Sequence, residues 1–210
     1  MTILETKQTA NNFTAMLTAH GRSPDIPESA DMYGVLIGSW EMDVVDYCSD
    51  GNVRRGRGEV HFGWVLEGRA VQDVWIMPGP DERPANPGQI RNRYGTTLRV
   101  WDPSIRAWRV TWINPVSGAR NELIGRRHGA DLVQLGSHAD GTPIRWIFTN
   151  ITTNSFRWIG EALEPDGKTW RLEAEFGCRR MSALDLLRRR HSGNERLEDK
   201  MRSLQAEEVS

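Results

Sequence analysis

Four polar residues occupy positions where strand alternation predicts an apolar, inward-facing side chain. They are Asp73, Asn114, Asn121 and Asn150. Asp73, for example, lies between Val71 and Trp75 on one face of its run. Burying such a group without a partner costs about 1–3 kcal/mol, so each needs a hydrogen-bond partner or a ligand. A carboxyl group among Trp rings is expected to have a raised pKa, which suits general acid–base chemistry or the anchoring of a polar ligand group.

Most of these residues also have a purely structural explanation. Asp73 would form a buried ion pair if an Arg such as Arg99 or Arg145 faced it. Asn114 and Asn150 stand at the ends of their runs, where an Asn side chain commonly caps a turn. The sequence leaves both interpretations of Asp73 open.

Tryptophan is unusually frequent, with nine Trp beside five Phe and three Tyr. The Trp residues on the inward parity of the expected strands are Trp40, Trp64, Trp75, Trp112, Trp146, Trp158 and Trp170. These rings either fill the interior or line a ligand pocket, because pockets are also mostly apolar and aromatic. We single out Trp75, Trp112 and Trp146 as ligand contacts, with Asp73 and the three Asn residues as the polar groups beside them.

The elements that must position these residues are ten β-rich runs, which predict an all-β fold. Turn residues such as Asp50-Gly51, Asp140-Gly141 and Asp166-Gly167 separate them. Short links imply antiparallel neighbours, and ten of them in sequence predict an up-and-down β-barrel. The runs are Val35–Cys48, Arg57–Leu66, Arg69–Met77, Tyr94–Trp101, Ala107–Asn114, Arg120–His128, Asp131–Gly136, Ile144–Thr152, Ser155–Leu163 and Thr169–Cys178.

Helical patterns flank the barrel on both sides. Thr9–His20 and Ser182–Gln205 place apolar residues at helical spacing. We therefore divide the chain into an N-terminal helical arm (1–34), a barrel domain (35–181) and a C-terminal helical tail (182–210). One long connection, Pro78–Arg93, has no periodicity, and such a loop often lies over a site.

The first run opens with a motif that resembles a known family. Leu36-Ile37-Gly38-Ser39-Trp40-Glu41 looks like the Gly-x-Trp opening of the lipocalins and other calycins. The resemblance implies that Trp40 plugs the barrel base and packs on an Arg after the last strand, where Arg179 and Arg180 stand. A cation–π contact would stabilise that arrangement.

Further segments resemble a bacterial group of calycin-like β-barrel proteins, a domain of unknown function, over about Val35 to Met181. The segments are Tyr94–Pro103, Trp108–Trp112, Trp146–Ile151, Ser155–Trp158 and Asp166–Trp170. This resemblance implies the barrel and supplies no catalytic motif.

Charge, motifs and cysteines argue against several classes of function. The formal net charge of −1 predicts no attraction to nucleic acid or to an anionic membrane, and the apolar runs are too short to span one. The five His residues show no metal-ligand spacing, and His128 and His138 fall in turns, so we expect no metal, haem or other cofactor. The N-terminus lacks a secretion signal, so the protein is expected in the cytoplasm, with Cys48 and Cys178 as free thiols at opposite barrel ends.

Three functions remain possible on these observations. The first is binding of a small apolar or aromatic molecule inside the barrel. The second is a cofactor-independent enzyme, a cyclase, isomerase or lyase, in which Asp73 moves a proton on a hydrophobic substrate. The third is dimerisation or partner binding through the C-terminal helix, which would make the protein a possible homodimer.

Overall fold

A computed structural model describes residues 12–79 and 93–187. The chain divides into two compact units, with the boundary between Arg180 and Met181. The elements of the first unit are β1 (Thr18–Ala19), η1 (Glu28–Ala30), η2 (Gly34–Leu36), β2 (Gly38–Tyr47), β3 (Val53–Val65), β4 (Ala70–Met77), β5 (Arg93–Asp102), β6 (Ala107–Asn114), β7 (Ala119–His128), β8 (Asp131–Ser137), β9 (Pro143–Thr149), β10 (Ser155–Leu163) and β11 (Trp170–Arg180).

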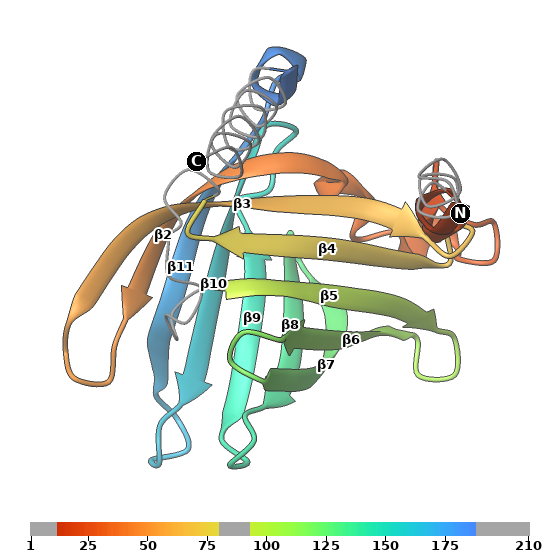
Figure 1. Ribbon diagram of the computed structural model, residues 1–210. Coiled ribbons are helices and arrows are strands. Elements are labelled where there is room, and N and C mark those ends of the chain that lie inside the picture. The colour runs from red at the N-terminus through yellow and green to blue at the C-terminus, as the bar shows by residue number, and fades with distance from the viewer. Residues whose placement is uncertain (1–11, 80–92, 188–210) are drawn as a thin grey trace, which may run out of the picture. The chain divides into compact units, whose positions relative to one another are not determined.

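Ten of these strands form a closed antiparallel barrel. Each strand from β2 to β11 pairs with its neighbour in sequence, and β2 pairs with β11 to close the sheet. Figure 1 shows β3, β4 and β5 running across β8–β11, so that the two parts of the sheet enclose the interior. The prediction of a ten-stranded up-and-down barrel is confirmed, because alternation and turn chemistry are local properties of the sequence.

The N-terminal flank differs from its predicted form. Residues 12–17 are helical, but Thr18 and Ala19 form β1 and pair with Val65 and Trp64. The partner strand β3 extends beyond β2, whose first residue Gly38 is opposite Phe62. The part of β3 that extends beyond β2 pairs with β1 instead, because the unpaired backbone groups of an edge strand favour pairing with another strand.

The segment that precedes β2 contributes to the core. Ile26, Met32, Tyr33 and Leu36 are buried, and the Trp108 indole donates a hydrogen bond of 2.9 Å to the carbonyl oxygen of Ala30. The predicted arm over residues 1–34 therefore supplies side chains to the barrel interior.

The second unit is described only as far as residue 187. Residues 183–187 are helical, and Ser182 and Asp185 exchange hydrogen bonds of 3.0 and 3.2 Å between side chain and backbone at its start, a capping box. The remainder of the predicted helix to Gln205 lies outside the described residues, as do residues 80–92 of the long connection.

Trp40 fills one end of the barrel interior and packs against Arg180. Trp40 is fully buried, its indole donates to the Leu36 carbonyl oxygen at 2.8 Å, and the Arg180 guanidinium lies 4.0 Å from its ring centroid. Gly38 has φ +128°, and a Cβ there would approach Arg180 Nη1 to 2.5 Å, so glycine is required at this position. Arg179 points away from Trp40 and lies 3.9 Å from Glu41 on the outer face.

We expect Arg180→Ala to lower the free energy of unfolding by about 2–3 kcal/mol, because a cation–π contact and several hydrogen bonds are lost together. The guanidinium donates to the carbonyl oxygens of Thr153, Ile37 and Val35 at 2.6, 2.7 and 3.0 Å. Arg179→Ala is the matched control, with an expected loss below about 1 kcal/mol. Urea denaturation of both variants measures the difference, and equal losses would contradict the assignment.

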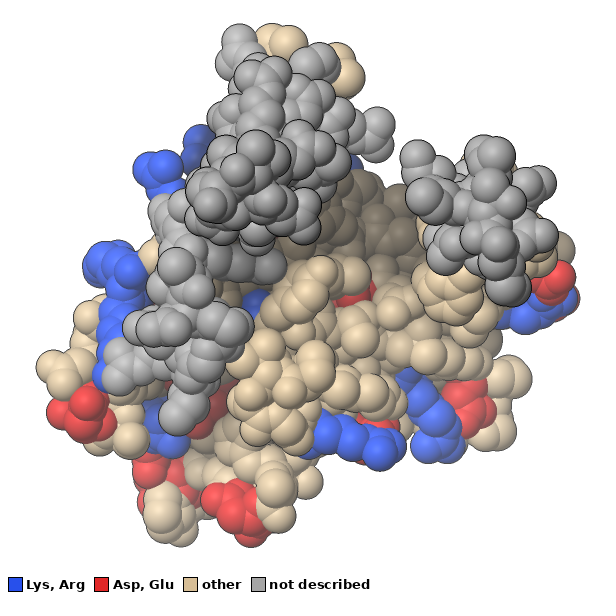
Figure 2. Space-filling model, viewed as in Figure 1, with Lys and Arg blue, Asp and Glu red and all other residues tan. Residues whose placement is uncertain are grey.

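One face of the molecule is mixed in charge. Figure 2 shows acidic and basic side chains interspersed over the described part of one face. An interspersed surface creates no long-range field of a single sign. In the described ranges, no helix is long and apolar enough to cross a membrane.

Candidate functional site

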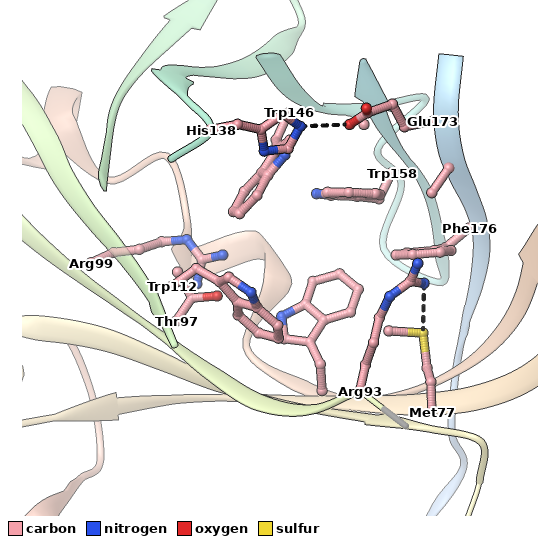
Figure 3. A pocket seen from close by; sticks show the side chains of 13 residues that line it. Met77, Arg93, Thr97, Arg99, Trp112, His138, Trp146, Trp158, Glu173 and Phe176 are labelled. Carbon is pink, nitrogen blue, oxygen red and sulfur yellow. Dashed lines mark hydrogen bonds and ion pairs between the residues drawn. The ribbon is translucent and has the colours of Figure 1, made fainter. Parts of the chain in front are cut away.

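A cavity of about 210 Å³ opens inside the barrel and is shown in Figure 3. Aromatic rings form most of its wall, and they come from β4, β6, β9, β10 and β11. These rings belong to Trp75, Trp112, Trp146, Trp158 and Phe176. The polar lining consists of Arg93, Thr97, Arg99, His138 and Glu173. An apolar cavity with a few converging polar groups is the usual form of a small-molecule site.

The aromatic rings contact one another in a continuous chain. Trp158 and Phe176 are stacked with centroids 4.6 Å apart, and Trp75 lies 5.8 Å from Trp158. Trp146 also lies 5.8 Å from Trp158 and meets Trp112 edge to face at 6.5 Å. Each ring is therefore held by another ring, so the wall keeps its shape without a ligand.

Two glycines explain why the Trp rings leave the centre open. A Cβ at Gly95 would lie 2.5 Å from the Trp112 ring, and a Cβ at Gly160 would lie 2.6 Å from the Trp158 ring. Both rings therefore pack closely against strands that have no side chain at that point. Glycine inside a strand often marks such a close approach. The structure thus favours a pocket lined by Trp over a barrel filled by Trp.

Asp73 and Arg99 form a buried ion pair beside the cavity. One Asp73 carboxylate oxygen accepts from Arg99 Nη1 at 2.6 Å, and the other accepts from the Thr97 backbone N–H at 2.7 Å. Asp73 is 0% exposed and Arg99 is 1% exposed. Arg99 lines the cavity whereas Asp73 does not, so Asp73 acts on the cavity by holding the guanidinium in place.

Aromatic rings also support the Arg99 guanidinium. Its carbon atom lies 5.0 Å from the centroid of Tyr33, 5.5 Å from that of Phe62 and 5.7 Å from that of Phe148. Burial raises the pKa of the Tyr33 hydroxyl, and the nearby guanidinium opposes that shift. The guanidinium is therefore fixed between a carboxylate and a set of rings.

Two further charged pairs lie on the cavity wall. Arg93 pairs with Asp46 at 2.5 Å and lies 5.6 Å from the Phe176 ring centroid. His138 Nε2 lies 3.1 Å from a Glu173 carboxylate oxygen. In Figure 3 the Arg93 and Arg99 side chains approach the space between the Trp rings from two sides.

A β-bulge brings Glu173 to the cavity. Gly160 pairs with Ala174 on β11, but the next residue, Glu161, pairs with Leu172, which leaves Glu173 as the extra residue. A bulge shifts the alternation of the strand, so the predicted parity fails on one side of it. For the same reason Trp170, predicted to face inward, is half-buried and packs its ring against the Arg145 guanidinium at 4.3 Å.

The structure separates the predicted site residues into two groups. Trp75, Trp112 and Trp146 meet at the cavity. The three Asn residues lie elsewhere, in turns or at a strand edge. Asn114 is buried and accepts a hydrogen bond from the Val116 N–H, Asn121 donates to the Ser137 carbonyl oxygen, and Asn150 is an exposed turn residue with φ +51°.

His138 was predicted to lie in a turn, and the sequence analysis gave it no role at the site. It follows β8 in a turn, but its ring lines the cavity because the turn folds toward β11. Arg93, His138 and Glu173 were therefore missed as site residues. Arg99, which lies on a β-rich run and was considered as a partner of Asp73, is the only sequence signal that we can identify for the polar part of the wall.

No metal centre is formed by residues 12–79 and 93–187, where no three His, Cys, Asp or Glu side chains cluster. Cys48 and Cys178 are free thiols, as predicted. Burial raises the pKa of the Cys178 thiol, so this side chain behaves as an inert core group.

The chain folds as a closed ten-stranded up-and-down β-barrel, the calycin-like fold that the sequence resemblance implied. No family model matches the sequence, and no curated protein matches it. Among solved structures it is similar to Rv2717c from M. tuberculosis, with a TM-score of 0.50, 11% identity, and coverage of 75% of this chain and 100% of that one. It is also similar to the S-type phycobiliprotein lyase CPES from Guillardia theta, with a TM-score of 0.47, 12% identity and coverage of 73% and 93%.

Proposed function

We propose that the protein binds a small apolar or aromatic molecule inside the barrel. The observation that carries this proposal is the cavity walled by five aromatic rings. At about 210 Å³ it exceeds the about 150 Å³ of a cavity that holds benzene and falls below the about 300 Å³ where larger ligand pockets begin. A molecule with one or two rings fits this volume.

The wall residues have separate roles in this proposal. Trp75, Trp112 and Trp146 contact the apolar body of the ligand, together with Trp158. The polar end of the ligand lies toward Arg99 rather than toward Asn114, because Arg99 lines the cavity and Asn114 is engaged in a turn. Asp73 serves as a positioning residue for Arg99.

Trp112→Ala tests the proposal. Trp112 is half-buried, so its truncation leaves a folded barrel but removes one side of the cavity. We expect the affinity for 2-naphthamide, measured by titration calorimetry, to fall about tenfold or more, because truncating a large buried anchor typically costs over about 1.4 kcal/mol. Trp170→Ala is the control on the outer face and should bind as the wild type does. Unchanged affinity in Trp112→Ala would refute binding at this cavity.

Proton transfer on the bound molecule, as in a cofactor-independent cyclase, isomerase or lyase, is the second candidate function. The His138–Glu173 pair favours it, because an imidazole held by a carboxylate is a common acid–base arrangement. Asp73 has both oxygens occupied by donors, so His138 is the better candidate for the proton-moving group. His138→Gln should abolish deuterium uptake from D₂O by a molecule that co-purifies with the protein, while retaining that molecule. Equal uptake would remove this candidate.

Two further proposals concern partners and location. The hypothesis of a homodimer or partner complex through the C-terminal helix depends on residues beyond 187, outside the described part of the chain. The location expected from the sequence, the cytoplasm, is the second of these proposals.

A further inference from the structure

A β-bulge places the Glu173 carboxylate on the cavity wall. Glu173 is the extra residue of β11, where Gly160 pairs with Ala174 and Glu161 pairs with Leu172. In a regular strand Glu173 would face away from the cavity, because its neighbour Ala174 lines it. Bulges are frequent next to functional sites, where they re-aim a side chain. The Glu173 side chain lines the cavity and is 28% exposed, so its carboxylate is available to a ligand.

The two cations on the cavity wall already have carboxylate partners of their own. Arg99 pairs with Asp73 at 2.6 Å, and Arg93 pairs with Asp46 at 2.5 Å. Both carboxylates lie behind the wall and do not line the cavity. Each pair carries no net charge, so the two Arg residues give the cavity little net positive charge.

Among the described residues, Glu173 has no cation to itself. Arg171 Nη2 lies 3.3 Å from one Glu173 oxygen, but Arg171 Nε lies closer to Glu164, at 2.7 Å. Two carboxylates therefore share one guanidinium. His138 Nε2 lies 3.1 Å from the other Glu173 oxygen, and a neutral imidazole N–H there donates a hydrogen bond without bringing a charge. The wall at Glu173 is left with an excess of negative charge.

The aromatic part of the wall also favours a positive charge. The faces of Trp and Phe rings attract a cation within about 6 Å of the ring centroid. The wall already holds one cation in this way, since the Arg93 guanidinium carbon lies 5.6 Å from the Phe176 centroid. A carboxylate beside several aromatic rings is therefore a suitable site for an organic ammonium group.

We propose that the ligand carries a protonated amine, which the Glu173 carboxylate binds beside the aromatic wall. Glu173 and Arg99 lie on opposite sides of the cavity in Figure 3, so the amine occupies the side away from the polar end that faces Arg99. An ammonium group only donates, and a carboxylate with two donors still has about two lone-pair sites for it. This inference rests on the proposed ligand-binding function and specifies the class of ligand, an aromatic amine.

The first experiment compares two probes of the same shape, 2-naphthylmethylamine and 2-naphthylmethanol, by titration calorimetry with the full chain at neutral pH. The amine is protonated under these conditions, as a Lys side chain is, and the alcohol is neutral. We expect the amine to bind more tightly by about tenfold or more, because hydrogen bonds between ionised groups are stronger than neutral ones. Equal affinities, or tighter binding of the alcohol, would overturn the amine assignment and leave the ligand-binding function standing. Binding of neither probe would overturn both.

The second experiment tests whether Glu173 causes the preference. Glu173→Gln keeps the size of the side chain and removes its charge, and a melting curve checks that the variant folds. We expect the ratio of amine affinity to alcohol affinity to fall by about tenfold, with the alcohol affinity changed less than about threefold.

Glu175→Gln is the matched control on the same strand. Glu175 does not line the cavity and accepts a hydrogen bond from the Tyr47 hydroxyl at 2.7 Å. This variant removes the same charge and should keep the wild-type ratio. A wild-type ratio in Glu173→Gln, or an equal loss in both variants, would refute the role of Glu173. The comparison of the two probes on the wild-type protein decides the class of ligand independently of both variants.

Discussion

Asp73→Ala should lower the free energy of unfolding by about 3–5 kcal/mol, the range observed when one partner of a buried ion pair is removed. The reason is the environment of Arg99, which is 1% exposed and would keep its charge with no counter-charge within hydrogen-bond distance. The Thr97 backbone N–H would lose its acceptor as well. Urea denaturation with linear extrapolation measures the loss.

Two controls distinguish the buried pair from ordinary surface charge. Arg120→Ala breaks the exposed 2.8 Å pair with Glu122 and should cost less than about 1 kcal/mol. The double variant Asp73→Leu with Arg99→Met replaces the pair by apolar groups and should recover most of the lost stability. A single Asp73→Ala variant as stable as the wild type would show that Arg99 finds another partner.

The largest effect on binding is expected from Ala174→Leu. Ala174 lines the cavity on β11 opposite Gly160, so a Leu side chain there occupies space needed by the ligand. Excluding about 100 Å² of ligand surface from burial costs about 2.5 kcal/mol at 25 cal/mol per Å². This corresponds to a loss of affinity of about sixtyfold.

The stability of this variant should change little, because the added methyl groups enter a cavity rather than a packed core. Ala174→Ser is the matched control, since it keeps the small volume at the same position and should bind 2-naphthamide within about threefold of the wild type. Retained affinity in a folded Ala174→Leu protein would place the ligand outside this cavity.

The ten strands and the aromatic interior could be predicted because both depend on local sequence properties. Alternation identifies the two faces of each strand, and short turns rich in Gly and Asp make neighbours antiparallel. For this reason Trp75, Trp112 and Trp146, which parity directs to the interior, are found on the cavity wall, and their contact with a ligand stays a prediction. The prediction from alternation was wrong at Trp170 and Glu173. The β-bulge adds one residue to β11, so side chains on one side of the bulge point to the opposite face from the one predicted, and no local sequence pattern indicates the bulge.

The polar half of the site depends on register, which the sequence leaves undetermined here. Asp73 meets Arg99 because it pairs with Thr97, two residues before Arg99 on the same face. The connection between β4 and β5 is long, so its length does not fix that register as a two-residue turn would. The sequence therefore offered Arg99 and Arg145 equally as partners.

By itself, the sequence determined a closed ten-stranded barrel with a Trp-rich interior, since strand faces and turns are encoded within a few residues. Only the tertiary structure decided that the rings leave a cavity. Trp112, for example, packs against Gly95 on the neighbouring strand, and this contact depends on how the strands come together in space. It also decided which polar groups line that cavity. His138 and Glu173 are 35 residues apart and meet at 3.1 Å only because the barrel closes around them.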